Sequence, residues 1–161
     1  MSPSTDTHTI TFEPEFIEAF RNLFEEQIVF NRVMGPRLVE VLPHRLSARI
    51  DMRPELVGHF MHGRMHGGVI SACLDALGGL ACVAALAARH MDEPPLQRML
   101  RFDKLGTIDL RIDYLRPAVS DSFHMHAEVM RLGSRVGSTR MEFHAANGLL
   151  LATGAAAYMV A

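Results

Sequence analysis

The chain has 161 residues, of which 48% are hydrophobic and 21% are charged, and its formal net charge is −2. This length and composition predict a soluble globular protein with one domain, residues 1–161, that is long enough to bury a hydrophobic core. The small net charge, without any run of Lys or Arg, argues against nucleic acid or an anionic membrane as the main partner.

The N-terminal region, residues 1–34, is expected to be a polar tail followed by an amphipathic helix. Met1–Thr9 has neither the basic nor the apolar region of a signal peptide, which favours a cytoplasmic protein. From Pro14 to Phe30, apolar side chains recur at helical spacing, and a proline suits the first turn of a helix. We therefore expect one helix over Pro14–Phe30, lying on the rest of the domain.

A long helix over Gly67–Ala88 is the expected centre of the fold. The segment is almost entirely apolar and about long enough to cross a bilayer, but its many Ala and Gly residues and Asp75 favour a buried helix of a soluble protein. Cys73 and Cys82 lie nine residues apart on this helix, so they cannot form a disulfide with each other. We expect them to be buried thiols of a reducing compartment.

Strands are expected on both sides of this helix. Residues 38–52 alternate apolar and polar side chains with an interruption at Pro43-His44, which predicts two strands or one bent strand, and residues 53–65 are expected to be a loop. After a connecting loop over 91–106, with a helical turn near 96–100, short turns separate four segments and predict an antiparallel meander. The four segments are Thr107–Leu115, Phe123–Leu132, Arg135–Ala145 and Leu149–Val160. The expected class is α+β, with a five- or six-stranded antiparallel sheet wrapped around the helix.

The start of the long helix is the strongest candidate for a chemical site. Gly67-Gly68 opens the helix, where the backbone N–H groups lack partners and the helix dipole is positive, so negative charge is stabilised there. Asp75 is a lone carboxylate about two turns further on, and it is costly in apolar surroundings unless it is paired, hydrated or used. Together they are typical of an oxyanion hole with a base or nucleophile, as acyl transfer requires. The structural alternatives are a turn that only starts a helix and an Asp that only caps a backbone group.

Residues around this pair have expected supporting roles. Ser71 lies one turn before Asp75 and is expected to hydrogen-bond to it. His66 is expected to shape the turn into the helix. A metal ion held by His59, His62 and His66 is the alternative, but this stretch contains two glycines and no cysteine joins it, so no metal is predicted.

Three further features occur in a characteristic order. They are His66-Gly67-Gly68 followed by Asp75, the segment Thr107–Pro117 ending in Tyr-x-x-Pro, and a tail with a Gly-containing turn, an Asn-Gly turn and a small-residue strand ending in Ala157-Tyr158. In this order and spacing, the chain from about residue 35 to its end resembles the hotdog fold and, within it, the PaaI-type acyl-CoA thioesterases.

The resemblance implies a catalytic site that contains Asp75, Gly67, Thr107 and His66. The backbone N–H of Gly67, after the motif residue His66, would donate to the thioester carbonyl oxygen, and Asp75 would act as nucleophile or general base. Asp75 would serve an active site formed with the neighbouring subunit, so that the protein works as a homodimer or a dimer of dimers. Thr107 occupies the place of a hydroxyl group that positions the attacking water. The resemblance implies no metal and no organic cofactor.

One position departs from the family pattern. Many relatives have Asn six residues before the motif histidine, where this chain has Phe60, and His59 or His62 is the candidate for the missing polar contact. Two arginines that flank strand ends are candidates for the phosphates of coenzyme A, because Arg pairs well with phosphate. The expected substrate-binding residues are Gly68, Ser71, Phe60, His62, Arg116 and Arg135.

The resulting hypothesis is a cytoplasmic, homo-oligomeric hydrolase of acyl-CoA thioesters. Its apolar composition, without obvious polar residues for an aromatic hydroxyl group, favours medium or long fatty acyl chains. The alternatives are a non-catalytic protein that binds acyl-CoA or an acyl chain, which the Phe60 departure favours, and a hotdog dehydratase that acts on acyl carriers. A dehydratase would need a catalytic His paired with an acidic residue, whereas Gly-Gly followed by Asp75 fits hydrolysis better.

Overall fold

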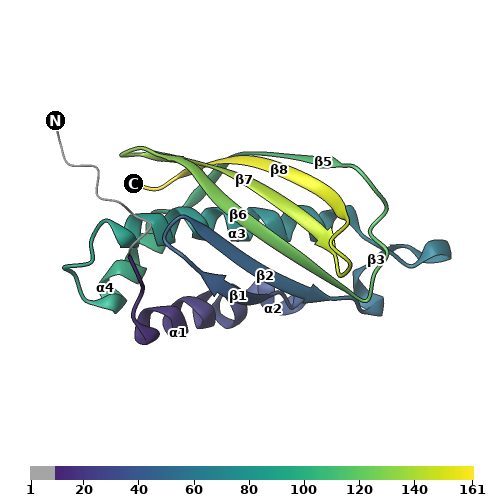
Figure 1. Cartoon of the computed structure of the whole chain (residues 1–161), viewed down its shortest axis with the longest axis horizontal. Coiled ribbons are helices and arrows are strands. Elements are labelled where there is room, and N and C mark those ends of the chain that lie inside the picture. The colour runs from purple at the N-terminus through teal and green to yellow at the C-terminus, as the bar shows by residue number, and fades with distance from the viewer. Residues whose placement is uncertain (1–9) are drawn as a thin grey trace.

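A six-stranded antiparallel sheet curves around one long helix, α3 (Gly67–Ala88), in the computed structural model, which describes residues 10–161 (Figure 1). The strands follow one another across the sheet in the order β1-β2-β6-β7-β8-β5. Their bounds are β1 (Arg37–Val41), β2 (Arg45–Asp51), β5 (Gly106–Tyr114), β6 (Ser122–Leu132), β7 (Val136–Ala145) and β8 (Leu150–Met159). The expected α+β class, sheet size and central helix are confirmed.

Helix α3 forms the centre of the hydrophobic core. It is the one helix of the described residues that is long and apolar enough to cross a membrane, yet 61% of its most apolar window is buried inside the fold. A helix that is apolar on all sides is stable in water only where other elements cover it, and here the sheet does so. Both cysteines are buried and free on this helix, as expected.

The sheet packs tightly against α3 at Gly78. A Cβ atom there would lie 2.5 Å from the Tyr158 hydroxyl oxygen and 2.7 Å from the Met141 sulfur. Tyr158 is only 1% exposed, and a hydrogen bond from its hydroxyl to the Asp75 backbone carbonyl opposes any displacement of its ring. A residue without a side chain is therefore required where β7 and β8 cross the helix.

Replacing Gly78 with alanine is expected to destabilise the protein by about 1–3 kcal/mol through overpacking, which exceeds the gain of roughly 0.5–1 kcal/mol in helix propensity. For a domain of this size this corresponds to a drop of roughly 2–12 °C in Tm, measured by thermal unfolding. The double variant Gly78→Ala/Tyr158→Phe is the control, because loss of the hydroxyl relieves the shortest contact. A double-mutant cycle compares this variant with the two single variants. If the effects of Gly78→Ala and Tyr158→Phe on stability simply add, the steric explanation is wrong.

The position of β5 corrects the expected meander. Strands β6, β7 and β8 are consecutive neighbours, but β5 pairs with β8 and lies at the edge of the sheet. The seven-residue connection 115–121 crosses from one side of this meander to the other. It spans three strand spacings, about 14 Å, which is within the reach of seven residues. Sequence periodicity contains no information on which strands are neighbours, and the shortness of this connection was misleading.

The N-terminal helix is broken, which also corrects an expectation. Instead of one helix over Pro14–Phe30, the chain forms α1 (Pro14–Asn22), a π-helical turn η2 (Leu23–Gln27) and α2 (Val29–Met34). Ile28, between them, has an extended ψ of 98°, and it and Val29 are β-branched, which weakens helix propensity. The buried Asn31 side chain donates to the Phe24 carbonyl at 2.9 Å and satisfies a backbone group beside the break.

Two connecting segments contain short elements, one where only a loop was expected and one where a helical turn near 96–100 was expected. Residues 53–65 form η3 (Pro54–Leu56), β3 (Val57–His59), η4 (Phe60–His62) and β4 (Arg64–Met65), a small hairpin that projects at one end of the molecule (Figure 1). The connection after α3 forms α4 (Pro95–Met99) and η5 (Leu100–Lys104). The turns at Gly133-Ser134 and Asn147-Gly148 occur as expected, and Gly148 takes the left-handed φ of 86° that suits glycine.

An ion pair between a buried arginine and a partly exposed glutamate joins α4 to the start of α1. The Arg98 side chain of α4 is fully buried, and its guanidinium donates to both Glu13 carboxylate oxygens at 2.6 and 2.7 Å. It also lies 5.0 Å from the Phe16 ring centroid. The guanidinium holds the pKa of the Glu13 carboxyl below its usual range. This contact fixes α4, and with it η5, against α1.

Candidate active site

Asp75 and Thr107 meet at one cavity. Asp75 comes from the middle of α3, and Thr107 from the first residues of β5. The Thr107 Oγ1 donates a hydrogen bond to the Asp75 Oδ1 at 2.9 Å. Both residues line a cavity of about 310 Å³, within the usual range for small-molecule sites. The two side chains that the sequence separates by 32 residues are thus neighbours in the fold.

The walls of this cavity are mainly apolar. Helix α3 supplies one side, and the opposite sides come from the broken N-terminal helix and from η5. Side chains that line it are Ile28, Phe30, Ala72, Ala76, Leu80, Phe102 and Leu105. The break at Ile28 and the 3-10 turn after α4 therefore shape the cavity. The sequence predicted an unbroken helix at the first of these places and a connecting loop at the second. A cavity of this kind suits an extended apolar group of a ligand, with the Asp75 carboxylate in the wall beside it.

Tyr158 contacts the backbone of Asp75 from the sheet. The buried Tyr158 hydroxyl, from β8, donates to the Asp75 backbone carbonyl at 2.9 Å. Burial, together with the nearby Asp75 charge, raises the pKa of the Tyr158 phenol, so the hydroxyl remains a donor. Sequence analysis placed Tyr158 in a family pattern but gave it no contact.

The beginning of α3 is capped by His66. The His66 Nδ1 accepts a hydrogen bond from the Gly68 backbone N–H at 2.8 Å, and the His66 backbone N–H donates to the Leu56 carbonyl at 2.8 Å. His66 therefore shapes the turn into the helix, the role expected of it. Gly67 is the first helical residue, so its N–H has no acceptor within the helix.

Tyr114 packs against Gly67 from β5. Its hydroxyl donates to the Gly67 carbonyl at 2.8 Å, and a Cβ on Gly67 would lie only 3.2 Å from the tyrosine ring. The chain has two tyrosines, and each donates to the backbone carbonyl of one of the two main candidate residues. The sequence could have drawn attention to these residues, because tyrosine is rare in it. It could not predict which backbone groups the two hydroxyls contact.

Gly67 and Asp75 lie too far apart to act on the same atom within one chain. Eight residues separate them on one helix, which corresponds to about 12 Å along the axis. They also line different cavities: Gly67 lines one with Tyr114 and Arg116, and Asp75 lines the apolar one. The helix thus presents its N–H donors and its carboxylate at two separate places.

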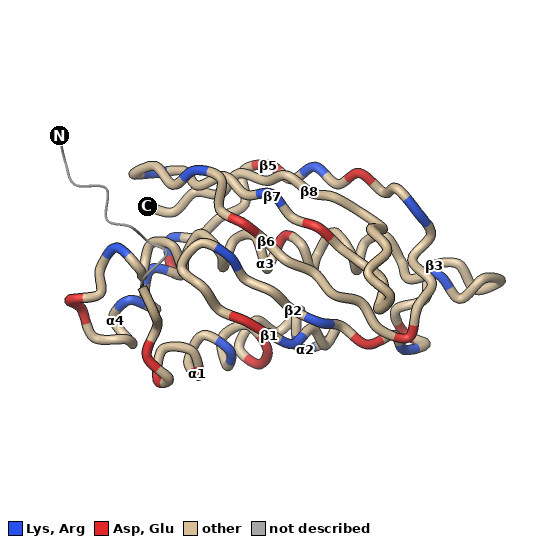
Figure 2. Tube along the Cα trace, viewed as in Figure 1, with Lys and Arg blue, Asp and Glu red and all other residues tan. Residues whose placement is uncertain are grey.

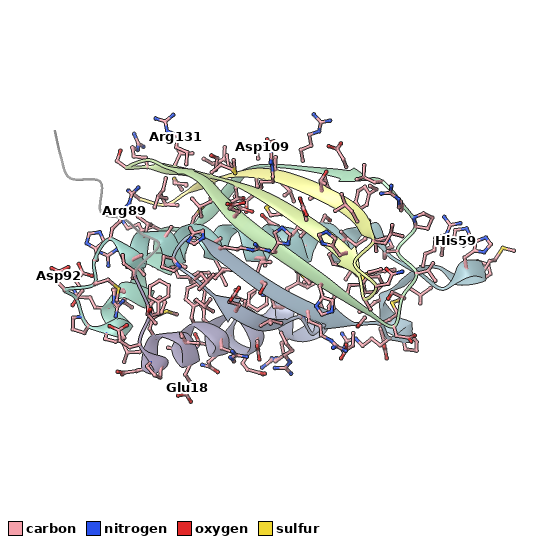
Figure 3. All side chains as sticks on the ribbon, viewed as in Figure 1. Glu18, His59, Arg89, Asp92, Asp109 and Arg131 are labelled. Carbon is pink, nitrogen blue, oxygen red and sulfur yellow. The ribbon has the colours of Figure 1, made fainter. Side chains whose placement is uncertain are left out.

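The remaining predicted residues are distributed over the surface. The Ser71 hydroxyl donates to the Gly68 carbonyl at 3.1 Å, so the expected bond to Asp75 is not formed. Phe60, which is 87% exposed, and His62 lie at the tip of the β3–β4 hairpin, where Figure 3 shows His59 far from the centre of the molecule. Arg116 lines the Gly67 cavity and donates to the Leu150 carbonyl at 2.8 Å, whereas Arg135 lines a separate cavity beside the β6–β7 turn.

The electrostatic features narrow the possible chemistry. Burial raises the pKa of both the Cys73 and the Cys82 thiol to about 12, so neither is a thiolate nucleophile at neutral pH. The His66 Nδ1 is occupied by a backbone N–H, so this atom is not available to a metal with His59 and His62. Lys and Arg alternate with Asp and Glu along the trace, without one large basic face in this view (Figure 2). Asp75 is a carboxylate that lines a mainly apolar cavity.

Comparison with known proteins identifies the family. The model of the thioesterase superfamily matches residues 62–152. The chain is 34% identical, over 138 residues, to the "Medium/long-chain acyl-CoA thioesterase YigI" of Escherichia coli K12, covering 86% of this chain and 89% of that protein. A crystal structure from Shewanella oneidensis, of a protein related to the thioesterase superfamily, has a TM-score of 0.84 with 34% identity and covers 93% of this chain and 100% of that one. A putative thioesterase from Syntrophus aciditrophicus has a TM-score of 0.79 with 27% identity, covering 91% and 97% of the two chains. The matched region contains the helix start, Asp75 and Thr107, and the chain belongs to the thioesterase superfamily.

Proposed function

We propose that this protein hydrolyses medium- or long-chain acyl-CoA thioesters to the free acid and coenzyme A. The observation that carries the proposal is the Asp75 carboxylate, which accepts a hydrogen bond from the Thr107 hydroxyl and lines a mainly apolar cavity. A carboxylate in such a place can act on the carbonyl of an apolar chain. The activity in the name of the E. coli relative, which shares 34% identity, supports the same substrate class.

In the proposed reaction, the Gly67 N–H donates to the thioester oxygen as negative charge develops on it. Such a donor at a helix start is pre-oriented, and in other enzymes one such donor contributes about 3–4 kcal/mol to catalysis. Asp75 either takes a proton from the attacking water or attacks the carbonyl carbon itself. The C–S bond then breaks, and the thiolate of coenzyme A leaves and takes up a proton. When water attacks, the free acid forms directly. When Asp75 attacks, the acyl group remains on its carboxylate as an anhydride, which a water molecule then hydrolyses to the free acid and Asp75. Every step uses side-chain and backbone groups of the protein, so no metal or organic cofactor is required.

Two copies of the chain would form each active site. Because about 12 Å of helix separates Gly67 from Asp75, one chain cannot place both groups on the same carbonyl, and the second group would have to come from another copy. Strand β5 offers a surface for this association: it is a nine-residue edge strand, and Ile108 and Tyr114 on it are each more than half exposed. We therefore propose a homodimer or a dimer of dimers.

The other predicted contacts complete the proposal. Arg116 is the better placed of the two arginines for a coenzyme A phosphate, because it lines the same cavity as Gly67. The other predicted substrate-binding residues stay predictions, and they are Arg135, Gly68, Ser71, Phe60 and His62. Two free, buried thiols are consistent with a protein of the cytoplasm, where we place it.

The proposal is tested by thiol release from a series of acyl-CoA esters, acetyl to palmitoyl, with phenylacetyl and benzoyl esters alongside. We expect kcat/KM to increase from acetyl to medium or long chains, because each additional methylene buries apolar area in the cavity, worth about 0.8 kcal/mol. Higher rates on the aromatic esters would contradict the proposed substrate class. Tight acyl-CoA binding without turnover would instead identify a binding protein.

A further inference from the structure

Three side chains converge on the face of the sheet that points away from α3. His126 comes from β6, and Glu142 and His144 come from β7. The residues that alternate with them along the two strands, such as Met125 and Phe143, are buried in the core. Because side chains alternate between the faces of a strand, the three lie on the opposite, outer face. Neither the catalytic proposal nor the sequence analysis assigns a role to this group.

The register of the two strands explains the convergence. His126 lies directly opposite Glu142 in the β6–β7 ladder, and His144 follows Glu142 by two residues, so it points to the same face. The Glu142 Oε2 lies 3.5 Å from the His126 Nε2 and 3.3 Å from the His144 Nε2. The two imidazole rings are nearly parallel, with centroids 5.6 Å apart and an interplanar angle of 19°.

The two distances from the carboxylate to the imidazoles match the separation of ligands that share one ion. The candidate ligand atoms all lie within 4.8 Å of one another. Zinc binds His nitrogen and carboxylate oxygen at about 2.0–2.2 Å, which places two ligands of one tetrahedral ion about 3.3–3.5 Å apart. The side chains are 24%, 33% and 21% exposed for His126, Glu142 and His144, so they are held by their neighbours while solvent can still reach the group.

We propose that His126, Glu142 and His144 form a binding site for a divalent transition-metal ion, with water completing its coordination. Two imidazoles and one carboxylate are the donor set that favours Zn²⁺ and its neighbours over Mg²⁺ and Ca²⁺, which prefer all-oxygen ligands. The ion would join β6 to β7 on the outer face. Its role is therefore distinct from hydrolysis, because Asp75 lies on the helix, on the other side of the sheet.

The test measures Zn²⁺ binding directly, with the full chain free of any affinity tag. Equilibrium dialysis with metal analysis is expected to give one ion per chain, and thermal unfolding is expected to show a Tm that rises with Zn²⁺ concentration, because the ion binds the folded state. The variants His126→Gln, Glu142→Gln and His144→Gln are each expected to lose this binding and the Tm rise. All three should retain thioester hydrolysis, since none lies in the proposed catalytic machinery.

Two histidine variants control for adventitious binding. His124 lies on the same face of β6 and opposite His144, but it is outside the converging group, so His124→Gln should bind Zn²⁺ as the unchanged protein does. His62→Gln tests the hairpin, where the His59 and His62 rings lie 4.8 Å apart. The proposal is overturned if the unchanged protein binds no Zn²⁺, if the three ligand variants still bind it, or if either control variant abolishes binding.

Discussion

Replacing Asp75 with asparagine is expected to lower kcat for acyl-CoA hydrolysis by about 10²–10⁴-fold, the range that a positioned base contributes. The amide has nearly the shape of the carboxylate, and its oxygen can still accept the hydrogen bond that Thr107 now donates at 2.9 Å. It can neither take a proton from water nor attack a carbonyl carbon. Saturating substrate and detection of the released thiol measure the effect on kcat separately from KM.

Two controls separate lost chemistry from lost structure. The Asp75→Asn protein should keep its circular dichroism spectrum, Tm and oligomeric state, because the Tyr158 contact uses the backbone carbonyl and is unchanged. Thr107→Val removes the hydroxyl but keeps the β-branched shape at the start of β5, and should lower kcat less than Asp75→Asn does. Turnover by Asp75→Asn at the rate of the unchanged protein would show that the assigned chemistry is wrong.

The fold was predictable where the pattern is local. The two-residue alternation of Thr107–Leu115 and the uniformly apolar composition of Gly67–Ala88 each determine a secondary structure within one segment. The edge position of β5 was not predictable in this way, since it depends on a chain crossing of three strand spacings. The break at Ile28 depends on tertiary contacts, such as that of the Asn31 side chain with the Phe24 carbonyl.

The same division applies to the candidate site. Gly67 and Asp75 lie in one motif on one helix, and their types alone suggest a donor and a base. The Tyr114 and Tyr158 contacts join residues 47 and 83 positions apart, so only the folded chain reveals them. The Ser71 prediction was wrong because its hydroxyl bonds to the nearer backbone carbonyl of Gly68, the usual competitor for a helical serine.

The N–H donor at the helix start can be removed by a substitution that suits the backbone conformation there. Gly67 is the first residue of α3, where proline is well tolerated, and His66 before it has φ −64° and ψ 132°, the extended conformation that proline requires of its neighbour. Proline lacks the N–H, so Gly67→Pro is expected to lower kcat by about 10²–10³-fold, the effect of losing one oxyanion donor. Gly67→Ala is the matched control, because it adds the same Cβ near Tyr114 but keeps the N–H.

Mixing the two inactive variants then tests whether the site is shared between chains. Each intact site would need its Asp75 from a Gly67→Pro chain and its Gly67 from an Asp75→Asn chain. When the two are co-expressed in equal amounts and assemble at random, this happens in about one quarter of the sites, both in a dimer and in a dimer of dimers. Activity is therefore expected to return to about one quarter of the level of the unchanged protein, although either variant alone is nearly inactive.

Activity returns in the mixture only if Gly67 and Asp75 of one site come from different chains. If each chain carried a complete site, every site in the mixture would contain one of the two changes, and the mixed protein would remain as inactive as its parts. The 12 Å of helix between Gly67 and Asp75 makes that outcome incompatible with one carbonyl held by both groups. An inactive mixture, in oligomers shown by mass spectrometry to contain both chains, would therefore refute the shared site while leaving the separate role of Asp75 intact.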